Sequence, residues 1–200
     1  ENAMRRKSFD ALVSTAGFVM AAVLLTASGL LFWAHSFIDD NVRSQLVAEK
    51  IFFPPAGSDA LKDPAVGPYL NKYAGQQLTT GDQAKAYADH FIAVHLSEIG
   101  GGKTYAQLSA QAQANPDDAK LAGQVQTMFR GETLRGLLLN AYAFDTMGTI
   151  AGIAAVVAYL SAAVLLVLGL LGLRHSRRVP VTEEILTRQP DSRGQELATA

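Results

Sequence analysis

Two long apolar runs without a single charged residue constrain this chain more than any other feature of its sequence. The first extends from residue 11 to residue 34, and the second from residue 147 to residue 173. At about 1.5 Å per residue, a helix of either length exceeds the ~30 Å hydrocarbon core of a bilayer. Buried helices of soluble domains are usually shorter, so the sequence predicts transmembrane helices at 11–35 and 147–173.

The charges that flank the two runs predict their orientation. Basic residues cluster at 5–7, before the first run, and at 174–178, after the second, whereas the segment 36–146 carries nine basic and twelve acidic residues. Lysine and arginine are retained on the cytoplasmic side of a membrane. We therefore expect a multi-pass plasma-membrane protein with residues 1–10 and 174–200 in the cytoplasm and residues 36–146 outside.

Aromatic residues lie near the outer end of each run, where Trp and Tyr commonly anchor helices at the membrane surface. These predicted anchors are Trp33, Tyr142 and Phe144. An alternative is that the first run belongs to a cleaved signal peptide, with small residues around Thr26-Ala27-Ser28 at the cleavage site. The apolar stretch continues past that point to Trp33, which favours a retained membrane anchor.

The segment between the runs has helical rather than alternating periodicity. The first helix is expected to continue outward until Pro54-Pro55 ends it. Residues 51–78 are rich in proline and glycine, which predicts an irregular wrapping loop, with a short strand pair as the alternative.

Two further helices and a long final one complete the prediction. Thr79, three residues before Asp82, is expected to begin a helix that stops at residues 100–102, and Thr104 to cap a short helix. Asn115 is expected to cap the last outer helix, which continues into the second run. The predicted fold is an all-α membrane protein whose two transmembrane helices extend outward into a small helical extracytoplasmic domain, with a disordered tail at 174–200.

No combination of residues in the sequence predicts a catalytic or metal site. Residues 102–104 (Gly-Lys-Thr) resemble the end of a phosphate-binding P-loop, but the earlier glycine and the strand of that motif are missing. His90 and His95 are about 140° apart around a helix, so they do not share a face as metal ligands would. The adjacent carboxylates at 39–40 and 117–118 do not converge as an acid–base pair. We predict no cofactor and no nucleotide, and the net charge of −1 predicts no nucleic-acid partner.

Small residues four positions apart in both runs predict close helix–helix packing. They are Gly17 and Ala21 in the first run, and Gly148, Ala151, Gly152 and Ala155 in the second. Two interpretations are open, because these residues could seal the protein's own helical hairpin or dock helices of another subunit. Further candidates for contact with a partner or ligand are Phe52, Phe53, Lys103 and Tyr105.

Several strings between the runs carry a family resemblance. They are Gln45-Leu46 with Glu49-Lys50-Ile51, Tyr73-Ala74-Gly75, Ala84 to Asp89 with His95, Gly101 to Leu108, and Leu134-Arg135. This pattern resembles a family of small two-span actinobacterial membrane proteins, often labelled "aromatic ring-opening dioxygenase LigA". The resemblance covers residues 10–173, with departures around 54–68 and 110–118, and implies a two-span plasma-membrane protein.

The family label implies an iron site of two histidines and one carboxylate. The four histidines of this chain are not spaced to form one, so we expect no enzymatic activity. The expected function is that of a non-catalytic accessory or scaffold subunit of a cell-envelope complex, contacting lipid and either a protein partner or a second copy. The alternative is an extracytoplasmic sensor or a module that binds a lipid or another small ligand.

Overall fold

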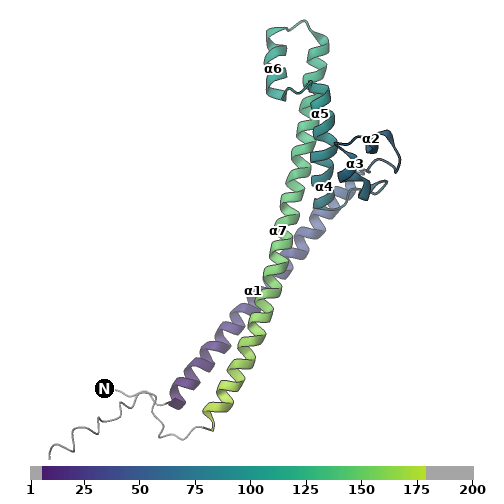
Figure 1. Ribbon diagram of the computed structural model, residues 1–200. Helices are drawn as coiled ribbons and strands as arrows, with labels where there is room; N and C mark the ends of the chain where they lie inside the picture. The colour runs from purple at the N-terminus through teal and green to yellow at the C-terminus, as the bar shows by residue number, and fades with distance from the viewer. Residues whose placement is uncertain (1–5, 179–200) are drawn as a thin grey trace, which may run out of the picture. The chain divides into compact units, whose positions relative to one another are not determined.

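The computed structural model describes residues 6–178, which are all-α apart from one isolated antiparallel bridge between Phe52 and Gln77. Its two longest helices are α1 (Arg6–Ala48) and α7 (Ala119–Ser176), and both are long and apolar enough to cross a membrane (Figure 1). The prediction of an all-α chain with two long apolar helices is confirmed. Residues 1–5 and 179–200, and with them most of the predicted cytoplasmic ends, lie outside the described residues.

Contacts divide the chain into two units, and the first comprises residues 1–31 and 154–200. Here α1 and α7 run antiparallel and approach closely at small residues. The Phe18 ring lies against Gly169, the Ser14 hydroxyl lies against Gly172, and Ser28 Oγ donates a 2.9 Å hydrogen bond to the carbonyl of Ala155. A side chain at either glycine would push the helices apart, so these residues allow the close approach.

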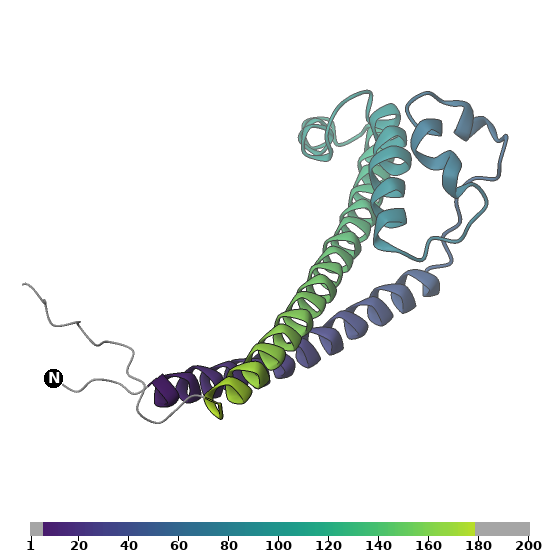
Figure 2. The same cartoon turned by 60° about the horizontal axis from the view of Figure 1, so that its bottom comes forward.

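The second unit, residues 32–153, contains the helical core. Its central rod consists of α4 (Gly81–Tyr87), the π-helical turn η2 (Ala88–Ile92) and α5 (Ala93–Gly100), and it lies beside α7 (Figure 2). The central rod and α7 run antiparallel, because residue numbers rise along the rod as those of their contacts on α7 fall. The four contacts are Gly81 with Asp145, Asp89 with Arg135, Leu96 with Gly131, and Gly100 with Met128.

The π-helical turn widens the buried face of this rod. Helical periodicity predicts one face with these residues: Ala84, Tyr87, Ala88, Phe91, Val94 and His95. The structure buries Ala84 and Ala88 and packs Tyr87, Phe91 and Val94 against the core, but it also buries Ile92 and Leu96, which the periodicity missed. In a regular helix, each four-residue step drifts about 40° around the axis. The wider π turn rotates less per residue and offsets part of this drift, so Ala84, Ala88, Ile92 and Leu96 stay on one side of the rod. Leu96 on this side lies against Gly131 of α7.

Residues 51–78 are more ordered than the sequence predicted. They form α2 (Asp59–Lys62), α3 (Gly67–Leu70) and the 3₁₀ turn η1 (Asn71–Tyr73), while backbone hydrogen bonds of 2.9 Å join Phe53 to Gln76 and Leu78 to Ile51. The apolar side chains of this segment lie in the core of the second unit: Phe53, Leu61, Val66, Leu70 and Leu78. The prolines and glycines therefore shape a packed segment, because the apolar residues between them are buried.

Two predicted helix boundaries on either side of this segment were wrong. The first helix ends at Ala48, and Lys50 follows in a left-handed conformation with φ of 51°, so the turn precedes Pro54-Pro55. The N-cap of α4 is Thr80 rather than Thr79, and Thr80 and Gln83 form a reciprocal capping box.

The boundaries of α6 (Tyr105–Ala114) and α7 show one success and one error. Thr104 caps α6 in a capping box with Gln107, as predicted. Asn115 does not begin the next helix, because its side chain donates a 2.9 Å hydrogen bond to the carbonyl of Gln111 at the end of α6. Asp118 begins α7 instead, with its carboxylate accepting a 2.9 Å hydrogen bond from the Leu121 amide.

Candidate functional site

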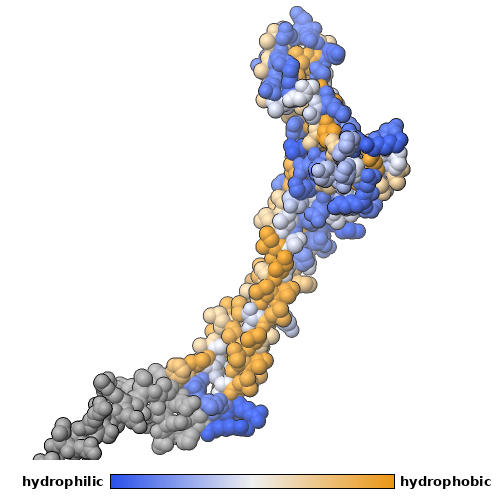
Figure 3. Space-filling model, viewed as in Figure 1, coloured by the Kyte–Doolittle hydropathy of each residue, from blue (hydrophilic) through white to orange (hydrophobic). Residues whose placement is uncertain are grey.

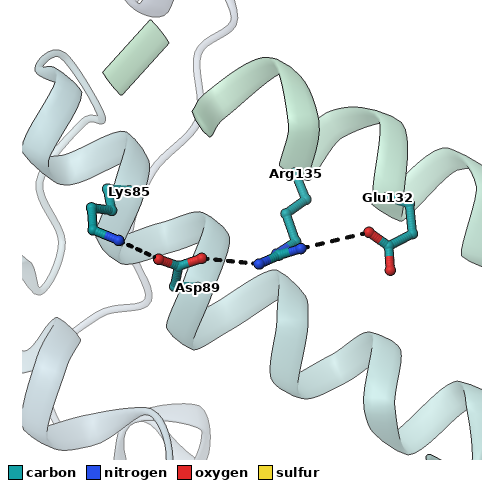
Figure 4. Close-up of polar contacts among 4 residues, drawn as sticks. All are labelled: Lys85, Asp89, Glu132 and Arg135. Atoms are coloured by element: carbon teal, nitrogen blue, oxygen red, sulfur yellow. Dashed lines mark hydrogen bonds and ion pairs between the residues drawn. The ribbon is translucent and has the colours of Figure 1, made fainter. Parts of the chain in front are cut away.

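A network of charged side chains joins the central rod to α7 (Figure 4). Asp89, on the π-helical turn, accepts a 2.6 Å bond from Lys85 Nζ on one oxygen and a 3.1 Å bond from Arg135 Nη2 on the other. Arg135 also lies 3.8 Å from Glu132, one turn earlier on α7. Asp89 therefore lies between two cations from two different helices.

The electrostatics of this network favour a structural role. The hydrogen bond from Lys85 is the main cause that lowers the pKa of Asp89, with Arg135 adding to it and partial burial opposing it. The same hydrogen bond raises the pKa of Lys85. Both groups are thus fully charged at neutral pH, and a general base needs a pKa close to the operating pH. Asp89 is best understood as an electrostatic tie between the rod and α7.

Aromatic rings line the other side of the rod. The Phe53 ring lies 5.1 Å from that of Tyr73 and 5.4 Å from that of Tyr87, and the series continues from Tyr87 through Phe91 to His95 with centroid separations of 4.7 and 4.4 Å. Burial raises the pKa of Tyr87. His95 Nδ1 lies 2.8 Å from the carbonyl of Phe91, so its ring is fixed by packing and one hydrogen bond.

Asp145 of α7 lies at the start of the central rod. Burial is the main cause that raises the pKa of Asp145, and the nearby carboxylates of Asp39 and Asp82 raise it further. The Gly81 amide and His35 act in the opposite direction. An ionised Asp145 therefore faces the amide end of the rod, which attracts anions, and two like charges, which repel it.

The small residues predicted to pack helices contact α1 and α7 of this same chain. A side chain on Gly148 would meet Ile38, and one on Gly152 would meet the His35 ring, whose Nδ1 lies 2.9 Å from the carbonyl of Gly148. Ala21 and Ala155 are buried, and Ala151 is half-buried. Gly17 is less tightly packed than Gly148 and Gly152, because a Cβ on it would meet only the Leu165 carbonyl, at 3.9 Å.

The three predicted membrane-surface anchors differ in environment. Trp33 is exposed and stacks on Phe37 with a centroid separation of 5.6 Å. Phe144 is also exposed, whereas Tyr142 is half-buried beneath Lys85, whose Nζ lies 5.3 Å from the ring centroid.

The four residues predicted to contact a partner or ligand do not form one site. Phe53 is 2% exposed and belongs to the core, whereas its neighbour Phe52 is 57% exposed. Lys103 is exposed and donates a 3.0 Å hydrogen bond to Gln111, and the half-exposed Tyr105 packs on Phe129. Phe52 thus lies at the surface while its neighbour packs inside, because successive side chains of extended backbone point in opposite directions.

A surface that the sequence analysis missed lies along α7 in the second unit. Phe129, Leu137 and Phe144 are 53%, 62% and 50% exposed, and Gly136 between them has no atom within 4 Å of the place where a Cβ would stand. We call these four residues the open α7 stripe. Helical periodicity predicts a shared face for Met128 and Phe129, yet only Met128 is buried. Adjacent helical residues point about 100° apart, so both could not be buried against the same neighbour.

Within residues 6–178, no group of three or more His, Asp or Glu side chains is placed to hold a metal ion. Comparisons of the chain with protein-family models, curated proteins and solved structures found no match. The class defined by the fold is therefore an all-α chain with two long apolar helices and a helical core between them.

Proposed function

We propose that this chain is a two-span plasma-membrane protein whose outer helical domain serves as an accessory or scaffold subunit of a cell-envelope complex. The membrane location is supported by the apolar stretches of α1 and α7, of which only 6% and 17% of residues are buried within the chain. Figure 3 shows apolar side chains gathered over these helices. Apolar surface costs about 25 cal/mol per Å² in water, so lipid is the environment that suits them.

The proposed orientation places both ends of the sequence in the cytoplasm. Its basis is the basic residues at 5–7 and 174–178 and the mildly acidic segment between the two runs. The resemblance to two-span actinobacterial membrane proteins agrees with this arrangement.

The open α7 stripe is the observation that carries the proposed interaction role. Phe129 and Leu137 precede the start of the second predicted span at residue 147 by 18 and 10 residues, or about 27 and 15 Å of helix, so lipid does not cover them. Phe144, three residues before the span, is the end of the stripe that reaches the predicted membrane surface. Large apolar side chains that neither the chain nor lipid covers mark contact surfaces for other proteins. The bare backbone at Gly136 would let a partner helix approach closely.

Replacing Gly136 by leucine tests this proposal without disturbing the chain's own packing. The variant should fold normally, because no atom lies within 4 Å of the new Cβ, but the larger side chain should block a docking helix. Gly123→Leu is the matched control, since Gly123 is equally open on α7 but precedes the stripe. Crosslinking in native membranes should give a defined adduct, hetero- or homo-oligomeric, that Gly136→Leu loses and Gly123→Leu keeps. Equal adducts from both variants, or a monomer in each case, would refute the proposal.

The second candidate function is a sensor or a module that binds a lipid or small ligand through the outer domain. The half-buried aromatic rings of Tyr87, Phe91 and His95 favour it, because such rings can pack against a small apolar molecule. Native mass spectrometry of the purified protein should then show a bound small molecule that Phe91→Ala releases. The wild-type mass without any adduct would remove this candidate.

A further inference from the structure

The end of α7 and the turn that follows it form a pocket that the proposed scaffold role does not use. The pocket has a volume of about 410 Å³ and is lined by Leu170, Leu173, Arg174, Arg177 and Arg178. All five residues belong to the first unit and follow or end the second apolar run. One wall is thus purely aliphatic and the other purely cationic.

Helical geometry brings Leu170, Leu173 and Arg174 to one face of α7, because they lie three and four positions apart. Arg177 and Arg178 follow in the turn after Ser176, where their amides donate hydrogen bonds of 3.2 and 2.9 Å back to the carbonyls of Leu173 and His175. The leucines come first along the helix and the arginines follow within about two turns, or ~11 Å. The pocket therefore changes from apolar to cationic along the helix axis.

The cationic wall suits a phosphate group. Guanidinium groups bind phosphate oxygens through paired, charge-assisted hydrogen bonds. Among residues 6–178, the pocket lining contains three arginines and no acidic residue. The helix C-terminus opposes an anion with the equivalent of roughly half a negative charge, which three guanidinium charges outweigh.

The aliphatic wall favours a lipid over a free anion as the ligand. Inorganic phosphate is strongly hydrated and gains nothing from contact with Leu170 and Leu173. An anionic phospholipid carries an acyl chain beside its phosphate and would match both walls at once. Its polar headgroup and chain would also follow the same apolar-to-cationic direction as the pocket.

We propose that this pocket binds an anionic phospholipid, with the phosphate held by Arg174, Arg177 and Arg178 and the acyl chain lying along Leu170 and Leu173. The inference rests on the membrane location proposed above. It adds a specific site to that location, one that selects lipids by headgroup charge.

Native mass spectrometry of the full chain in mild detergent tests this inference. Phosphatidylglycerol and phosphatidylcholine with identical acyl chains are offered at equal concentrations, and the wild type should retain the anionic lipid preferentially. Replacing the three arginines by glutamine should weaken its binding about tenfold or more. The matched control R43Q/K120Q/R130Q removes the same charge from exposed positions of the second unit and should bind as the wild type does. Equal retention of both lipids, or equal losses in the two triple variants, would overturn the inference.

Two further arms identify the ligand chemistry. The R174K/R177K/R178K variant keeps the charge but lacks the paired guanidinium donors, so its preference for phosphatidylglycerol should fall. If the lysine variant kept the full preference for phosphatidylglycerol, positive charge alone would explain the binding, and the assignment to an arginine-lined pocket would be overturned. Millimolar inorganic phosphate should leave the bound lipid in place, and displacement by phosphate alone would overturn the assignment to a lipid.

Extraction of native membranes with alkaline carbonate separates the two proposals. If the wild type is washed off, the membrane location itself fails. If it stays in the membrane but shows no lipid preference, only the pocket assignment fails.

Discussion

Replacing Gly81 by alanine probes a close contact between the central rod and α7. Gly81 is buried at the start of α4, and a Cβ on it would lie 2.7 Å from both Cγ and Oδ2 of Asp145 and closer still to its Cβ. Ordinary van der Waals contact begins at 3.4 Å. The two helices would therefore have to separate by about 0.7 Å or more, and tightly packed interiors resist such shifts.

The expected cost follows from two opposing effects. Overpacking of this kind costs about 1–3 kcal/mol. Alanine recovers roughly 0.5–1 kcal/mol, because glycine loses more backbone entropy on folding. Contacts of 2.7 Å and less place this site in the upper half of the overpacking range, so the net loss is about 1–2.5 kcal/mol. The fraction of molecules in which the rod has opened should therefore rise about 5- to 70-fold.

Hydrogen exchange of the amides in residues 81–100, measured by mass spectrometry on the detergent-solubilised chain, reports this opening directly. Exchange should accelerate in Gly81→Ala and stay the same or slow in Gly136→Ala, where the Cβ meets nothing within 4 Å. In the Gly81→Ala background, Asp145→Gly should restore protection, whereas Asp145→Ala should not, because it keeps the clashing Cβ. Unchanged exchange in Gly81→Ala would refute the packing argument.

The remaining predictions concern charge and burial in the second unit. Asp145→Asn should raise the midpoint of thermal unfolding at pH 7. Because the pKa of Asp145 is raised, its ionised carboxylate destabilises the fold as the pH rises through the folded pKa. The gain from the variant should therefore disappear below about pH 4, where the carboxyl group is protonated in both states. A lower midpoint for the variant at pH 7 would contradict this sign. Asp89→Ala should cost about 1–3 kcal/mol at neutral pH, because it leaves two cations without their shared partner. Since the pKa of Asp89 is lowered, its stabilisation is present above the unfolded pKa of about 3.9 and lost as the pH falls through the folded pKa, so variant and wild type should converge in acid. Met128→Ala should lower the free energy of unfolding in urea by about 2–5 kcal/mol, because Met128 is buried. Phe129 is its exposed neighbour, so Phe129→Ala should change this free energy by less than about 0.5 kcal/mol. Similar losses in the two variants would refute the assigned burial.

Features that depend on neighbouring residues could be predicted from the sequence. The two apolar runs indicated both long helices, the glycines at 100–102 marked the end of α5, and Thr104 marked the start of α6. Errors of one to a few residues arose where adjacent residues can make the same cap, as with Thr79 and Thr80. The i, i+4 spacing of Lys85 and Asp89 is also visible in the sequence, as a local ion pair.

Features that depend on distant contacts could not be predicted. Arg135 is 46 residues from Asp89, and nothing in the local pattern pairs them. The burial of Val66 and Leu70 in a proline- and glycine-rich segment depends on the rest of the core of the second unit. The π-helical turn keeps Ile92 and Leu96 on the same side as Ala84 and Ala88, so regular periodicity missed the burial of Ile92 and Leu96.

Labelling of single cysteines in intact cells tests the central claim most directly, because the chain contains no cysteine of its own. Gln113→Cys in the outer domain should react with a membrane-impermeant thiol reagent. Ser192→Cys should react only after the cells are permeabilised, and Val157→Cys within the second run should stay unreactive in both conditions. Labelling of Ser192→Cys in intact cells, or reaction of Val157→Cys as fast as that of Gln113→Cys, would contradict the account.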